Sequence, residues 1–162
     1  MTTETERSAE RLIDAPAAVI FDILSNPERH PETDASGTVV SDEKTNRIKA
    51  VGDVFRMNMT SNAGRGREPE YQTDNHVTGF IENKLIAWRP GPTDADEPFG
   101  WEWLYELEPQ GSEATLVRLS YRWGDVDKNT VNQVGLPKFE ASDLEASLGQ
   151  LASAVAAAQS RS

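Results

Sequence analysis

Cysteine is absent from the 162 residues, which excludes disulfide bonds, thiol nucleophiles and thiolate metal sites. Histidine is scarce, because His30 and His76 are the only two. A zinc site would therefore need carboxylate ligands, and no such spacing stands out, so we expect no metal and no cofactor. No apolar run approaches the roughly 20 residues of a membrane span, and the first residues lack the layout of a signal peptide. These features predict a cytoplasmic protein that does not insert into membranes.

Positive charge is also in short supply. The chain has 16 Lys and Arg residues and 27 Asp and Glu residues, which gives a formal charge of −11. Nucleic acids and anionic membrane surfaces both require clustered Lys and Arg, so the composition argues against either partner. A solvated acidic surface that aids solubility explains the charge. Arg65 and Arg67 fit a solvated loop better than an anion clamp, since no phosphate-loop pattern surrounds them.

The long helical pattern of the chain lies near its C-terminal end. Leu144, Leu148, Leu151 and Val155 recur at three-and-four spacing, which predicts an amphipathic helix from Pro137 to about residue 158, with the proline in its first turn. A shorter apolar stripe predicts a helix over 17–24, and a second short turn is expected over 28–30. An amphipathic helix of this length needs an apolar surface to lie on.

Alternating apolar and polar residues predict that surface to be a sheet. Strands are expected over 4–13, 38–41, 47–51, 52–60, 71–80, 85–89, 99–108 and 114–123. In the last hairpin, one register places Glu106 opposite Arg118, Glu102 opposite Arg122 and Trp103 opposite Tyr121. This register turns the Trp and Tyr face inward and both glutamates outward, and alternation likewise points His76 outward.

The stretch RLIDAPAAVIFDILSNPERHPETDASG resembles the opening of START-related proteins of the SRPBCC superfamily, which contains polyketide cyclases and dehydrases and the major birch pollen allergen. The matching pieces here are Ile-Asp-Ala-Pro at 13–16, Asn-Pro-Glu at 26–28 and His-Pro at 30–31. Further pieces resemble the bacterial branch of that superfamily: Gly52 with FRMNM, Tyr71 with Asn75 and Val77, Ile86 with Trp88, and Trp103 with Tyr105. The resemblance covers essentially Ala9 to Ala158.

This resemblance, together with the element order, implies an α+β helix-grip fold. Such a fold has a curved antiparallel sheet of about six or seven strands, two short helices after the first strand, and a long C-terminal helix packed on the concave face. We expect one domain over residues 1–162, with an ordered core over about 4–158.

In a helix-grip fold the sheet and the long helix enclose a cavity. The side chains predicted to face it are aromatic, Met and Leu residues with a few polar groups: Phe55, Met57, Met59, Tyr71, Asn75, Trp88, Trp103, Tyr105, Tyr121, Leu144, Leu148 and Leu151. Such a lining suits a lipophilic or aromatic small molecule, although the same residues could simply fill the core. Asn75 could bond a ligand carbonyl or hydroxyl, or else the backbone or water.

Three functions are compatible with these features. The first is binding, sequestration or transport of a small hydrophobic ligand such as a lipid, a polyketide or an aromatic molecule. The second is a polyketide cyclase or dehydratase that uses the same cavity, with His30, Asp34 or a tyrosine moving protons. The third is a protein-interaction module of the stress-regulator or cochaperone type, which needs an exposed apolar patch. The sequence contains no catalytic motif to carry over, and His30 and Asp34 could equally fix the loop after the short helices.

Overall fold

A computed structural model describes residues 4–35, 38–43, 46–60 and 70–160 of the chain. Within these ranges, seven antiparallel strands form one sheet in the order β1-β7-β6-β5-β4-β3-β2. The strands are β1 (Glu6–Ile13), β2 (Val39–Asp42), β3 (Val54–Met59), β4 (Tyr71–Ile81), β5 (Leu85–Gly91), β6 (Glu102–Pro109) and β7 (Thr115–Arg122). The helices are α1 (Ala17–Leu24), the 3-10 helix η1 (Pro27–Arg29), α2 (His30–Thr33), α3 (Lys128–Val134) and α4 (Ala141–Ser160).

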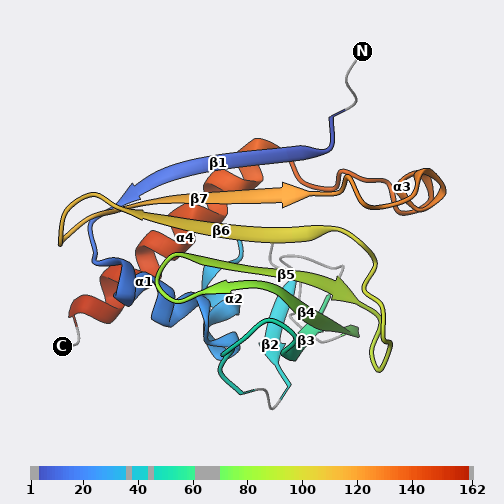
Figure 1. Ribbon diagram of the computed structural model, residues 1–162, viewed down its shortest axis with the longest axis horizontal. Helices are drawn as coiled ribbons and strands as arrows, with labels where there is room; N and C mark the ends of the chain where they lie inside the picture. Colours follow the sequence, from blue (N-terminus) through green and yellow to red (C-terminus); the bar gives the residue numbers. More distant parts are fainter. Residues whose placement is uncertain (1–3, 36–37, 44–45, 61–69, 161–162) are drawn as a thin grey trace.

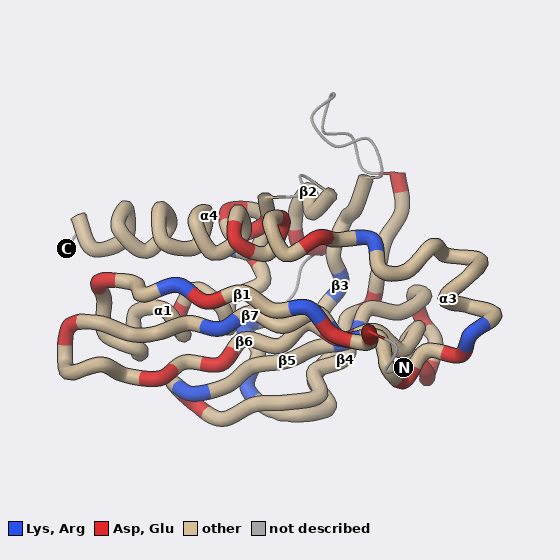
Figure 2. Tube along the Cα trace, turned by 90° about the horizontal axis from the view of Figure 1, so that it is seen from above, with Lys and Arg blue, Asp and Glu red and all other residues tan. Residues whose placement is uncertain are grey.

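Helix α4 lies along β1 and β7 on one face of the sheet, and α1 and α2 pack on the same side (Figures 1 and 2). Leu144, Leu148, Leu151 and Val155 are each at most 1% exposed, because the predicted stripe faces the sheet. Two short helices follow β1, and the long helix closes the chain. The protein therefore has the helix-grip fold, as the sequence predicts.

The long helix begins later than predicted. The backbone N–H of Glu140 donates to the Asp143 carboxylate at 2.7 Å, and the Glu140 carbonyl accepts from the Asp143 N–H at 3.0 Å. This arrangement caps a helix that starts at Ala141, so the placement of Pro137 in its first turn is wrong.

Helix α3 is an element that the sequence reading missed. Asp127 caps its start by accepting from the Thr130 N–H at 2.9 Å, and Gly135 ends it in the left-handed region with φ of 81°. None of its residues is buried, so the sequence has no apolar stripe from which this helix could be predicted. In both views α3 lies at the end of the molecule opposite α1 (Figures 1 and 2).

The predicted strand over 47–51 is wrong. Asp53 folds this segment into a turn, because its carboxylate accepts from the backbone N–H groups of Lys49 and Ala50 at 2.8 and 3.1 Å. Ile48 is buried, and its N–H donates to the Ser25 carbonyl rather than to a strand. The remaining predicted strands are present, with ends that shift by up to three residues; β6, for example, begins at Glu102.

The predicted register of the last hairpin is confirmed. Glu106 lies opposite Arg118, Glu102 opposite Arg122 and Trp103 opposite Tyr121. The aromatic pair stacks with ring centroids 4.6 Å apart on the inner face. Arg122 pairs with Glu102 at 3.4 Å, but Arg118 instead donates to the Ser8 hydroxyl at 3.1 Å. The ring stack is thus a firmer marker of the register than the charge pairs.

Candidate functional site

Most of the residues predicted to face the helix do lie in the interior. Those that are at most 6% exposed are Phe55, Met57, Asn75, Tyr105, Tyr121, Leu144, Leu148 and Leu151. Met59, Trp88 and Trp103 pack against the core but stay partly exposed. Tyr71, at the start of β4, is 46% exposed and does not join the buried set. Arg65 and Arg67 lie outside the described residues.

The inner face has a closed part and a more open part. Leu148, Leu151 and Tyr121 are at most 1% exposed, so no water-sized space reaches their side chains. Trp88 and Trp103, which oppose each other across β5 and β6, stay partly exposed. The α4 side of the interior is therefore filled by its own side chains, and Trp88 and Trp103 are inner-face aromatic residues that stay partly exposed.

Trp88 lies in a group of aromatic rings. The His30 ring stacks on Trp88 with centroids 4.9 Å apart and meets the edge of Phe55 at 5.3 Å. Trp88 also contacts Tyr105, at 5.9 Å. The strands β3, β5 and β6 supply three of these rings, and α2 supplies the imidazole. These flat, rigid surfaces suit an aromatic or lipophilic molecule.

His30 is held in one neutral form. Its Nε2–H donates to the Leu24 carbonyl at 2.8 Å, which leaves Nδ1 without a proton. Burial lowers the pKa of His30 to about 4, although the Leu24 carbonyl and two nearby aspartates act in the opposite direction. Asp34 accepts from the Val39 backbone N–H at 3.1 Å instead of bonding the imidazole. The two residues fix the chain around α2 and do not form a dyad.

Tyr105 carries a buried hydroxyl to which no described residue makes a hydrogen bond. Its side chain is only 6% exposed, and burial, assisted by the negative charge of Asp34, raises the pKa of the phenol. The fully enclosed polar atoms that lack a partner in the described part of the chain are His76 Nε2, Arg89 Nε and Ser120 Oγ. Buried hydroxyls are normally partnered, so the Tyr105 oxygen keeps the capacity to bond one further group.

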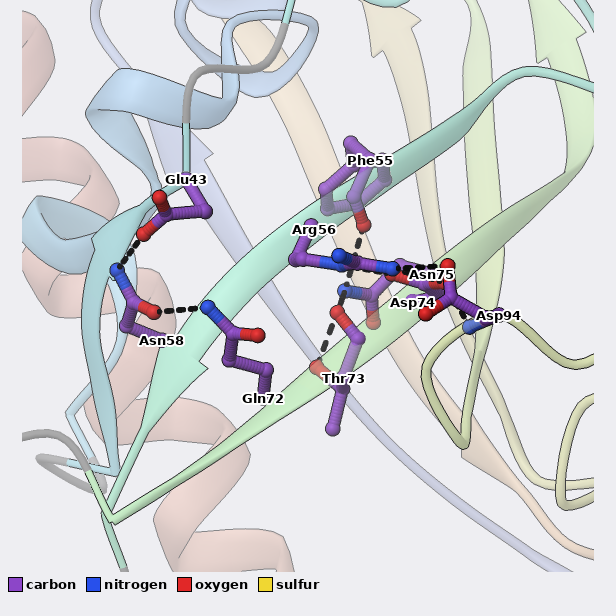
Figure 3. Close-up of polar contacts among 9 residues, drawn as sticks. All are labelled: Glu43, Phe55, Arg56, Asn58, Gln72, Thr73, Asp74, Asn75 and Asp94. Carbon is purple, nitrogen blue, oxygen red and sulfur yellow. Dashed lines mark hydrogen bonds and ion pairs between the residues drawn. The ribbon is translucent and has the colours of Figure 1, made fainter.

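Asn75 and Tyr121, the polar residues favoured by the sequence, are already engaged. The Asn75 amide nitrogen lies 3.1 Å from the Phe55 carbonyl and 3.2 Å from the Thr73 hydroxyl (Figure 3). The Tyr121 hydroxyl accepts from the Lys138 N–H at 3.5 Å. Both groups stabilise the fold, and Tyr105 is the polar group left over. Sequence reasoning placed Tyr105 inside but could not show that its hydroxyl lacks a partner.

The outer face of β3 and β4 holds a charged cluster that the sequence reading did not anticipate. Arg56 binds both carboxylate oxygens of Asp74, at 2.7 and 3.0 Å, and also reaches Asp94 at 2.8 Å (Figure 3). The Arg56 hydrogen bond holds the pKa of Asp74 below its ordinary value. Arg56 and Asp74 face each other in the register, which alternation and a hairpin assignment for β3 and β4 could have revealed. His76 lies on this outer face as predicted, opposite Arg89.

The described residues contain no group of three or more His, Asp or Glu side chains placed to hold a metal ion. Among the described helices, none is both long enough and apolar enough to cross a membrane.

Solved structures with the same architecture define the class of this protein as helix-grip. Norcoclaurine synthase from Thalictrum flavum, solved with dopamine and hydroxybenzaldehyde, matches 93% of this chain and 85% of its own, with a TM-score of 0.60 and 16% identity. The Aha1 dimer from Colwellia psychrerythraea matches 94% and 96%, with a TM-score of 0.55 and 19% identity. A Mycobacterium smegmatis protein matches 95% and 92%, with a TM-score of 0.64 and 12% identity. At these identities the likeness concerns the fold.

The sequence itself is similar to an uncharacterised protein of Mycobacterium tuberculosis. The two are 31% identical over 150 residues, which is 90% of this chain and 61% of the relative. A second strain of that species has a relative that is 30% identical over the same length. The chain thus spans 61% of the length of the curated relatives it matches. No family model matches the chain.

Proposed function

We propose that this protein is a START-like member of the SRPBCC superfamily and binds a small hydrophobic, preferentially aromatic molecule at the inner face of its sheet. The observation that carries the proposal is the buried Tyr105 hydroxyl, unpartnered among the described residues, beside the partly exposed Trp88. An aromatic wall with a single unsatisfied polar group offers apolar burial for affinity and one hydrogen bond for orientation. A single domain over 1–162 and a cytoplasmic location remain predictions.

Binding is favoured over catalysis by the state of the titratable groups. Proton transfer needs an acid or base that can reach a substrate atom and exchange a proton near the working pH. His30 uses its one N–H on the Leu24 carbonyl and has a pKa lowered to about 4, while the pKa of Tyr105 is raised. The similar norcoclaurine synthase is an enzyme by name, so an enzyme of related chemistry is the second candidate.

A protein-interaction role has weaker support. Leu12 and Ile81 are 55% and 53% exposed on the outer face, and the Colwellia relative in fold was solved as a dimer. Exposed single leucines and isoleucines are ordinary on protein surfaces.

Equilibrium dialysis with naphthalene, which has no polar group, tests the proposal. We expect the wild-type protein to bind naphthalene and Trp88→Leu to bind it about tenfold more weakly, because the indole supplies much of the apolar contact. The matched control is Phe99→Leu, since Phe99 is 42% exposed and its ring stacks on Trp101 at 4.8 Å. Circular dichroism verifies that both variants fold. Absence of naphthalene binding, or equal weakening in both variants, would count against the proposal.

A further inference from the structure

The outer face of β1 and β7 carries a regular pattern of charge. The charged outward residues of β1 are Glu6 and Glu10, those of β7 are Arg118 and Arg122, and all four are exposed. The register places Glu6 opposite Arg122 and Glu10 opposite Arg118. One strand therefore presents a row of carboxylates, and its neighbour presents a row of guanidinium groups at the same two levels.

The remaining outward positions of the two strands are matched as well. Ser8 lies opposite Ser120, between the two charged levels, and Leu12 lies opposite Leu116, beyond them. Leu12 is 55% exposed, whereas Ala9 and other residues on the opposite face of the same sheet are buried on the side where α4 packs (Figure 2). Level by level, the outer face thus carries acid and base, serine and serine, acid and base, then leucine and leucine.

The charges at the middle of this face are not neutralised within one chain. In the part of the chain that the structure describes, neither Glu10 nor Arg118 belongs to an ion pair, and Arg118 donates to the Ser8 hydroxyl at 3.1 Å. Arg122 reaches Glu6 only at 4.0 Å. These side chains keep the capacity to pair with charges that another molecule brings.

A second copy of the chain presents the complementary pattern. A two-fold axis that runs along the strands, midway between β1 and β7, sets β1 of each copy against β7 of the other. Glu10 then faces the partner's Arg118 twice, once in each direction, and Leu12 faces the partner's Leu116. An axis at right angles to the strands would instead set Arg118 against the partner's Arg122. The charges therefore select the first orientation, in which two sheets stack face to face.

We infer that the protein forms a homodimer in which the outer face of β1 and β7 packs on the same face of a second copy. This inference goes beyond the proposed function, which concerns the opposite face of the sheet. Ion pairs near solvent contribute little each, and the formal charge of −11 on each chain opposes association at a distance. We therefore expect a weak dimer, with the monomer predominating at low micromolar protein concentration.

Sedimentation equilibrium of the wild-type protein over about 5–500 µM tests the dimer. The average mass should rise with concentration from that of one chain toward that of two. Glu10→Arg and Arg118→Glu should each raise the dissociation constant at least about tenfold, because each sets like charges against one another at both symmetric contacts.

Glu145→Arg is the matched control for Glu10→Arg. It makes the same change of charge at an exposed position of α4, on the other side of the sheet, and should leave the dissociation constant within about twofold or lower it. Both substitutions reduce the net negative charge, so a weaker dimer in Glu10→Arg alone cannot come from overall repulsion.

Mixing the two single variants sharpens the test. In a mixed dimer of Glu10→Arg with Arg118→Glu, each contact again has one acid and one base, so the mixture should dimerise about as tightly as the wild type. Because Glu10 and Arg118 also face each other within one chain, circular dichroism and thermal unfolding verify that each variant folds.

A wild-type protein that stays monomeric up to the highest concentration overturns the inference. So do single variants that dimerise as the wild type does, or a mixture of folded variants that stays monomeric. Naphthalene binding tests the inner face separately, so the homodimer and the proposed function can fail independently.

Discussion

On the outer face of β3 and β4, Arg56 and Asp74 meet across the two strands and Asp94 completes the cluster (Figure 3), whereas on the inner face Phe55 packs against His30 and Trp88. The outer cluster pairs its charges with one another near solvent. The inner face gathers aromatic rings and leaves the Tyr105 hydroxyl unpartnered among the described residues. A paired group gains little from a further hydrogen bond, whereas an unpartnered buried hydroxyl gains more, so the proposed ligand would bind on the inner face.

The largest expected effect comes from truncating a buried leucine of α4 that packs on the inner face of the sheet. Leu148→Ala should lower the free energy of unfolding by about 2–5 kcal/mol, because Leu148 is fully buried and its removal leaves a void. Leu12→Ala, at an exposed outer-face leucine, should change it by less than about 0.5 kcal/mol. Urea denaturation measures both. A loss below about 1 kcal/mol for Leu148→Ala would mean that space already surrounds this side chain.

Lowering the pH should reduce the stability of the fold through protonation of His30 on the inner face. Its pKa is about 4 in the folded protein against an ordinary value of 6.5, so the folded state favours the neutral ring. The associated stability is fully present above pH 6.5 and is lost as the pH falls toward 4. That shift corresponds to about 3 kcal/mol.

Urea denaturation across this pH range, with His30→Gln as the comparison, measures the loss. The variant should lack the part of the pH dependence that His30 supplies. Parallel loss of stability in both proteins, or an imidazole that titrates at its ordinary value by NMR, would contradict the prediction.

A smaller effect is expected on the outer face. Asp74→Asn should destabilise by about 1–3 kcal/mol at neutral pH, because it removes a carboxylate that binds Arg56 through two hydrogen bonds. Asp94→Asn is the matched control, and since its side chain is 84% exposed we expect a change below about 1 kcal/mol. Thermal unfolding followed by circular dichroism compares the two.

The Asp74 effect should also depend on pH. Because Arg56 lowers the pKa of Asp74, its stabilisation is present above the ordinary value of 3.8 and is lost as the pH falls through the lowered pKa. The gap between wild type and Asp74→Asn should therefore close in strong acid. A gap that stays constant would show that the carboxylate charge is not what stabilises this cluster.

Sequence periodicity was sufficient for the elements that bury a regular stripe. The stripe through Leu144 and Leu148 predicted α4, and the alternation around Trp103 and Tyr121 predicted the hairpin and its register. It failed where local side-chain bonds direct the backbone. Asp53 converts the predicted strand at 47–51 into a turn, and Asp127 starts a helix that has no apolar stripe.

The order of predicted strands and helices, together with the resemblance carried by the opening stretch, was enough to predict the helix-grip architecture. An alternating strand pattern and a helical stripe each need an apolar partner, and few arrangements of one sheet and one long helix bury both. The sequence also predicted most of the buried side chains, with Tyr71 as an exception. Only the tertiary structure decided which inward polar groups are satisfied. Asn75 finds the Phe55 carbonyl and His30 finds the Leu24 carbonyl, whereas Tyr105 finds no partner among the described residues. Hydrogen bonds between distant segments depend on positions set within a few tenths of an ångström by packing, and sequence patterns do not encode distances at that scale.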